Sequence, residues 1–236
     1  MSSTILVKDL KDIYGENLLS VILYGQNTDS EQYKEESGQN IIVIFNKLEA
    51  SDIKNAIVAI KKWIKAKNAL PIIMSESEWQ NSADVYPIEY IEIKNNYEIL
   101  YGKNVVDPIS VSKYDLRLQC EYEIKNLLVR IRQIYLGNSD NPKFIVKNLE
   151  ELSSKLIRIL KSALHLFDVT APDEYSEVIQ KIAEKAKFDG EIFVEILSAK
   201  ENKRKFTPQK IEGLVQRAVN STDLLYKFIN DVEIGE

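Results

Sequence analysis

Two runs of apolar residues, joined by a polar loop, constrain the fold of this chain more than any other feature. The first run is Val21-Ile22-Leu23-Tyr24, which ends at Gly25-Gln26, and the second is Asn40-Ile41-Ile42-Val43-Ile44-Phe45. Short continuous apolar runs bounded by turn residues are typical of fully buried strands. A glycine after such a strand suits a tight turn. The sequence therefore predicts two buried strands in the core of a layered domain.

Further helix and strand patterns alternate up to about residue 108. The expected elements are an opening helix over residues 5–13, a helix capped by Ser51 or Asp52, a third strand at Leu70–Met74, a capping box from Ser75 to Glu78, a fourth strand at Pro87–Ile93 and a short helix at 95–100. Strands interleaved with helices in this order indicate an α+β domain with a mixed sheet.

The strand patterns end near Pro108, and helical patterns follow. Leu116, Cys120 and Ile124 begin an apolar stripe that continues to Ile134 at helical spacing. Similar stripes are expected on a second helix around 149–167, on a third that begins at Pro172, and on a last one after Thr207-Pro208. We therefore predict a sheet domain at 1–108 and an all-α antiparallel helical bundle at 109–236.

The two apolar runs and their loop resemble the signature of the polymerase-beta-type nucleotidyltransferases, such as the kanamycin and minimal nucleotidyltransferases. In that family a strand leads to a Gly-Ser turn and a loop, and Asp-x-Asp or Asp-x-Glu opens the next strand. Glu98-Ile99-Leu100-Tyr101-Gly102 is similar to a Leu-Tyr-Gly segment near the end of such domains. The resemblance covers roughly residues 17–108 and implies the fold of this family.

The charged positions of the family pattern are neutral in this chain. Gln26 stands at the serine, and Gly38 and Asn40 stand at the two metal-binding carboxylates. Nucleotidyl transfer needs those carboxylates because they hold the Mg²⁺ that stabilises the developing negative charge. We therefore expect no metal site, no cofactor and at most weak nucleotide binding at Gly25, Gln26, Gly38 and Asn40. Aspartates at positions 38 and 40 should restore a metal site.

Two acids remain as candidates for a displaced site. Glu36, in the loop, would rescue Mg²⁺ binding if it folded back to the N-terminal end of the second strand. Active relatives carry a third acid on a later strand, and Glu92 on the predicted fourth strand is our candidate for its remnant. Glu89 would face the opposite side of that strand. An exposed sheet face is the simpler explanation for one or both glutamates.

Arg158 and His165 are similar to the Arg-x(4–6)-His motif of HEPN-type ribonucleases, which also contain helical bundles. The motif is short, and a solvated helix surface accounts for the same residues.

Composition limits the remaining classes. The net charge of -5 gives no general attraction for nucleic acid. The single cysteine, Cys120, excludes an internal disulfide framework and fits a reducing cytosol. No secretory signal or membrane-spanning run is visible, so we expect a cytoplasmic protein. The amphipathic stripes of the second half predict a homodimer or a protein partner.

Three hypotheses follow. The chain is a nucleotidyltransferase-fold protein that has lost catalysis and acts in binding or regulation. Alternatively, it is an active nucleotidyltransferase with displaced carboxylates, which transfers a nucleoside monophosphate to a small-molecule or protein hydroxyl. The third hypothesis is a HEPN-like ribonuclease or toxin–antitoxin component.

Overall fold

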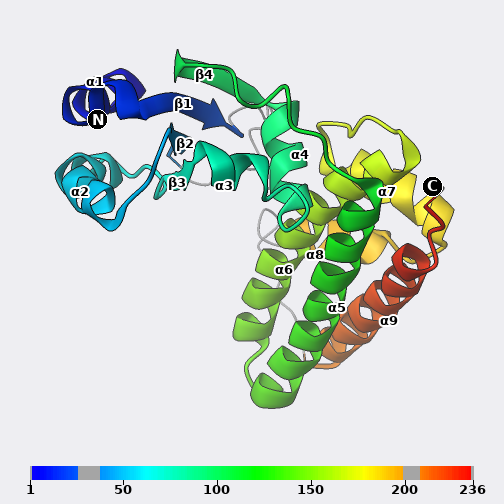
Figure 1. Ribbon diagram of the computed structural model, residues 1–236. Coiled ribbons are helices and arrows are strands. Elements are labelled where there is room, and N and C mark those ends of the chain that lie inside the picture. Colours follow the sequence, from blue (N-terminus) through cyan, green and yellow to red (C-terminus); the bar gives the residue numbers. More distant parts are fainter. Residues whose placement is uncertain (1, 26–37, 199–207, 235–236) are drawn as a thin grey trace. The chain divides into compact units, whose positions relative to one another are not determined.

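The computed structural model describes residues 2–25, 38–198 and 208–234, and it divides the chain into two compact units (Figure 1). The first unit is Met1–Ser112 and the second is Lys113–Glu236. We call the first the sheet unit and the second the helical unit. The division falls at Ser112, close to the expected boundary at residue 108.

The sheet unit contains a four-stranded mixed sheet in the order β3-β2-β1-β4. Its strands are β1 (Leu18–Tyr24), β2 (Asn40–Phe45), β3 (Ile72–Ser75) and β4 (Tyr97–Gly102). β1 runs antiparallel to both β2 and β4, whereas β3 runs parallel to β2. The prediction of an α+β protein with a mixed sheet is confirmed.

Helices cover both faces of this sheet, which explains why β1 and β2 are apolar at almost every position. Alternate strand residues point to opposite faces. Val21, Val43 and Phe45 pack with α1 (Ser3–Tyr14) and α2 (Ala50–Lys65) on one face. Ile22 and Ile44 pack on the other face with α3 (Glu76–Gln80), α4 (Pro87–Asn95) and the segment after β4. A short 3-10 helix, Gly15–Asn17, joins α1 to β1.

Capping boxes fix the start of α2 and α3. In α3 the predicted box is confirmed, because Ser75 Oγ accepts the Glu78 N–H and Glu78 Oε2 accepts the Ser75 N–H at 2.7 Å. In α2 the prediction of Ser51 or Asp52 as the cap is wrong. Glu49 is the N-cap, and Asp52 is the third helical residue whose carboxylate accepts the Glu49 N–H at 2.9 Å.

The assignments of Pro87–Ile93 as a strand and of 95–100 as a helix are wrong. Pro87–Asn95 forms α4, and Tyr97–Gly102 forms β4, the partner of β1. Pro87, Ile88, Tyr90, Ile91 and Ile93 are all buried. Their spacing is close to three residues, so it fits a helix with a wide buried face, and proline suits a first helical turn.

In the helical unit, all regular elements among the described residues are helices. They are α5 (Lys113–Asn138), α6 (Pro142–Ala163), the 3-10 helix η3 (Leu164–Phe167), α7 (Tyr175–Ala186), α8 (Glu191–Ser198) and α9 (Pro208–Asn230). α5 lies beside both α6 and α9, and it runs antiparallel to α6 (Figure 1). The predicted stripe from Leu116 to Ile134 is buried on α5. The third helix begins at Tyr175 rather than at Pro172.

Among the described residues, none of the helices has the length and apolar character that a bilayer crossing requires.

Candidate functional site

The candidate site lies at the N-terminal end of β2, where the family pattern would place its metal. β1 ends at Tyr24, whose register partner is Asn40, the first residue of β2. Gly25 follows with a φ of 71°, a conformation that favours glycine. Gln26 and Glu36 lie outside the described residues, so neither their expected roles nor a rescue by Glu36 is described.

The backbone N–H of Gly25 is already used within the sheet unit. It donates to the carbonyl oxygen of Asn96 at 3.0 Å, just before β4 begins. The resemblance implies instead that this turn offers backbone N–H groups to a triphosphate. Gly25 therefore serves the turn and ties β1 to the start of β4, and its own N–H is occupied.

Gly38, at the position of the first metal-binding carboxylate, has no room for a side chain. A Cβ built on Gly38 would lie 2.2 Å from the carbonyl oxygen of Lys67 and 2.3 Å from Asn68 Cα. Both neighbours are backbone atoms, so a rotamer change cannot relieve the contact. The Gly38 N–H also donates to the Lys67 carbonyl at 3.1 Å. The loop between α2 and β3 therefore closes this position to a carboxylate.

The loop that closes the position is held by several hydrogen bonds. Asn68 Oδ1 accepts the N–H of Gln39 at 3.0 Å, and Asn68 Nδ2 donates to the carbonyl of Trp63 at 3.3 Å. The indole N–H of Trp63, which is fully buried, donates to the Ala69 carbonyl at 2.8 Å. Lys67 has a φ of 63°, which reverses the chain after α2. Asn68 thus connects the last turn of α2 to the residues just before β2.

Asn40 is half-buried, and its side chain is directed toward Gly25. Asn40 Nδ2 lies 3.5 Å from the position that a Cβ on Gly25 would take. An amide can offer one oxygen to a cation, but it brings no negative charge, and Mg²⁺ sites in proteins typically rely on carboxylates. Asn40 therefore places a neutral polar group at the N-terminal end of β2, without the negative charge that Mg²⁺ binding for nucleotidyl transfer requires.

The neighbouring strand β3 does not bring an acid to this end of the sheet. β3 consists of Ile72, Ile73, Met74 and Ser75, and it runs parallel to β2. The acids that follow it, Glu76 and Glu78, come after the partner of Phe45, at the far end of β2 and roughly 16 Å from Asn40. Glu76 forms an ion pair with Lys103 at 3.0 Å, and Glu78 belongs to the capping box.

Glu92 does not have the strand position that we expected. It lies on α4, and Glu89 lies three residues earlier on the same helix. The two glutamates therefore share one helix face instead of facing opposite sides, and both are half-buried. Within residues 2–25, 38–198 and 208–234 no three Asp, Glu, His or Cys side chains are grouped as metal ligands.

Arg158 and His165 lie on different elements of the helical unit. Arg158 is part of α6, while His165 is in η3, the 3-10 helix that follows. Burial lowers the pKa of His165, and the nearby carboxylate of Asp168 opposes this effect only in part. Asp168 itself forms an ion pair with Lys113 at 2.7 Å. His165 is thus a predominantly neutral imidazole at pH 7.

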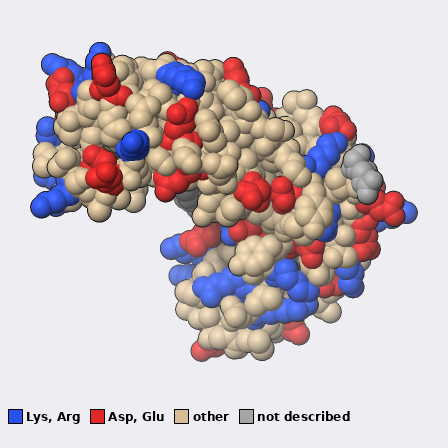
Figure 2. Space-filling model, viewed as in Figure 1, with Lys and Arg blue, Asp and Glu red and all other residues tan. Residues whose placement is uncertain are grey.

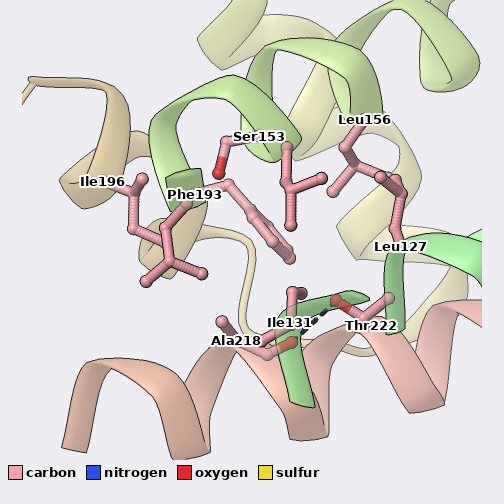
Figure 3. Close-up of a pocket in the computed structure, with 10 residues that line it drawn as sticks. Leu127, Ile131, Ser153, Leu156, Phe193, Ile196, Ala218 and Thr222 are labelled. Carbon is pink, nitrogen blue, oxygen red and sulfur yellow. Dashed lines mark hydrogen bonds between the residues drawn. The ribbon is translucent and has the colours of Figure 1, made fainter. Parts of the chain in front are cut away.

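A small apolar pocket lies between α5, α6, α8 and α9 (Figure 3). Leu127 and Ile131 face Leu156 and Phe193 across it. The hydroxyl of Thr222 at its edge donates to the carbonyl of Ala218 on the same helix at 2.7 Å. Among the described residues no charged side chain lines the pocket, and its space is far too small for a nucleotide. It is a packing gap in the core of this unit.

The residues that determine this site were missed in the sequence. Asn68 and Lys67 lie between two predicted elements, and no local pattern links them to Gly38. The available signal was the glycine itself, because a glycine that opens a strand often marks a close backbone approach.

A comparison with models of known protein families finds no match, and a comparison with curated proteins finds no significant relative.

Proposed function

We propose that the sheet unit has a nucleotidyltransferase-type fold without transferase chemistry, and that the protein acts by binding another molecule or by regulation. The fold part rests on the order of its elements. A helix precedes two antiparallel strands, and a second helix leads to a third strand parallel to β2. This order agrees with the strand–loop–strand frame that motivated the resemblance.

The absence of chemistry rests on one observation, the closed position at Gly38. Nucleotidyl transfer requires two metal-bound carboxylates that share one side of the strand, two residues apart. Here one of these positions contacts the Lys67–Asn68 backbone, and the other is the neutral Asn40. Substitution of one residue cannot restore the pair, because an aspartate at position 38 would first have to displace the loop.

Calorimetry and a transfer assay test this proposal together. ATP and GTP are titrated into the full chain with and without Mg²⁺, and labelled nucleotides are then incubated with the protein and with candidate acceptors. We expect no binding that depends on Mg²⁺ and no transfer. Asn40→Asp is the matched variant, because it adds a carboxylate of the same shape without disturbing the loop, and we expect it to behave like the parent.

Mg²⁺-dependent transfer by the unmodified chain would overturn the proposal. It would favour the active alternative, in which an acid such as Glu36 holds Mg²⁺ and the product is a nucleotidylated small molecule or protein. Substitution Glu36→Gln would then abolish transfer.

The HEPN-like ribonuclease remains a separate hypothesis. Its specific support is His165, whose neutral imidazole suits a general base. Incubation of the parent and of His165→Ala with a mixed single-stranded RNA tests it. Cleavage by the parent that His165→Ala loses would favour this function over a binding role.

A further inference from the structure

α5 carries two stripes of large side chains, and only one of them belongs to the core of the helical unit. Leu116, Cys120, Ile124 and the apolar residues that follow them are buried. A second stripe is exposed, and we call it the outer stripe. It consists of Leu118, Tyr122, Lys125, Val129, Arg132 and Leu136. Its four apolar members are 39% to 82% exposed.

The spacing of the outer stripe is that of a coiled-coil seam. Its members follow one another at intervals of four, three, four, three and four residues. This alternation is the a/d pattern of a heptad repeat, in which side chains along a seam pack against a second helix. Within the described residues the stripe faces away from the buried side of α5, and its apolar members are exposed, while Lys125 near its middle reaches the Tyr226 ring on α9.

The order of residues in the outer stripe makes it complementary to itself. When a second α5 is laid antiparallel, with a two-fold axis at the level of Leu127, Leu118 meets the partner's Leu136. Tyr122 then meets the partner's Arg132, and Lys125 meets the partner's Val129. All three contacts pair an a position with a d position, which is the layer geometry of antiparallel coiled coils.

Each of these contacts has favourable chemistry. The two leucine contacts would bury apolar area at both ends of the seam, and the partner's Arg132 over the ring of Tyr122 would form a cation–π pair. The ammonium group of Lys125 lies 4.0 Å from the centre of the Tyr226 ring on α9. Its aliphatic stem would then be available to pack against the partner's Val129.

A neighbouring carboxylate reduces the repulsion between the cations of two copies. Asp223 on α9 pairs with Lys227 at 2.7 Å. The pKa of Asp223 is lowered by Lys227 and, to a lesser extent, by the positive charges of Arg132 and Lys125. The positive charges of Lys125 and Arg132 are therefore partly balanced by a negative charge of the same copy. Figure 2 shows Lys and Arg side chains gathered on one face of the helical unit.

We propose that the outer stripe of α5 is a homodimer interface in which two copies of this chain form an antiparallel helix pair. The contact from Leu118 to Leu136 is about 27 Å long. A contact of this length is at the small end of specific interfaces, so we expect dissociation in the micromolar range. The proposal does not depend on the function of the sheet unit.

Sedimentation of the full chain tests the association itself. From about 1 to 100 μM we expect the mean mass to rise from that of one copy toward that of two. Leu136→Glu should keep the chain monomeric over this range. Val58→Glu is the matched control, because Val58 is 66% exposed on a helix of the sheet unit, and it should dimerise like the parent. Circular dichroism verifies that both variants are folded. A parent that stays monomeric throughout overturns the proposal.

Cysteine crosslinking tests the register. Cys120 is buried and does not interfere. A mixture of Leu118→Cys and Leu136→Cys should crosslink with a short bismaleimide, since these positions meet across the two-fold axis. Neither variant alone should crosslink efficiently, because its two copies of the cysteine would lie about 27 Å apart. Efficient crosslinking of either variant alone, or none in the mixture, contradicts the antiparallel register.

Discussion

Substitution of Gly38 by alanine should destabilise the sheet unit by about 3 kcal/mol. The new Cβ would lie 2.2 Å from the Lys67 carbonyl oxygen, so the loop between α2 and β3 has to move. The movement weakens the hydrogen bonds from the Gly38 and Gln39 N–H groups to the loop, at 3.1 and 3.0 Å.

The magnitude follows from three contributions. Overpacking at a site bounded by backbone costs about 1 to 3 kcal/mol. Two weakened hydrogen bonds cost about 1 kcal/mol each. The loss of backbone entropy in the unfolded chain when alanine replaces glycine offsets about 0.4 to 1 kcal/mol of this cost.

Urea unfolding followed by tryptophan fluorescence measures the free energy of unfolding of the sheet unit. The chain has two tryptophans, Trp63 and Trp79, and both are buried in the sheet unit. Gly213→Ala is the control, because a Cβ on Gly213 meets none of the described residues within 4 Å and Gly213 lies in α9 of the helical unit. It should leave the tryptophan transition unchanged. If the midpoint for Gly38→Ala corresponds to less than about 0.5 kcal/mol of destabilisation, the inference that the Lys67–Asn68 backbone leaves no room for a side chain at position 38 is refuted.

Three further outcomes are expected. Asn68→Ala removes the bond to the Gln39 N–H and should destabilise the sheet unit by about 1 to 3 kcal/mol in the same fluorescence assay. Ser162→Ala should be neutral or stabilising by thermal unfolding of the helical unit, because the buried Ser162 hydroxyl has no hydrogen-bond partner among the residues that the structure describes. The only histidine, His165, should titrate below pH 6.5 by NMR, since burial lowers its pKa and Asp168 offsets this only in part. The unfolded chain then binds more protons as the pH falls through 6.5, so this residue should reduce stability below that pH, and His165→Gln should weaken the dependence.

The sequence predicted the strands β1 and β2 well because their apolar runs are unbroken and are buried on both faces. The capping box at Ser75 was predictable for a similar reason, since both of its partners are local in sequence. Pro87–Ile93 was not, because an apolar pattern interrupted by Glu89 and Glu92 also resembles strand alternation. The spacing of about three residues and the proline at the first turn fit the helix, and the packing against Trp79, with the Tyr90 hydroxyl donating to the Trp79 carbonyl, stabilises it.

The candidate site was predictable in its neutral charges but not in its geometry. The residue types alone show that positions 38 and 40 carry no carboxylate. That position 38 has no space depends on Asn68, which lies thirty residues further along the chain. The expectation that aspartates at positions 38 and 40 would restore a metal site is therefore withdrawn for position 38 on steric grounds.

The strand order also affects how the sheet unit assembles during synthesis. β1 and β2 pair first, because they are near in sequence, but the other edge of β1 is completed only by β4. Ser20 and its partner Gly102 are separated by about eighty residues, and closing a loop of that length costs about 4 kcal/mol of chain entropy. Until β4 leaves the ribosome, the nascent chain presents an unpaired apolar edge of β1, and this edge is where a chaperone or a second nascent chain would bind first.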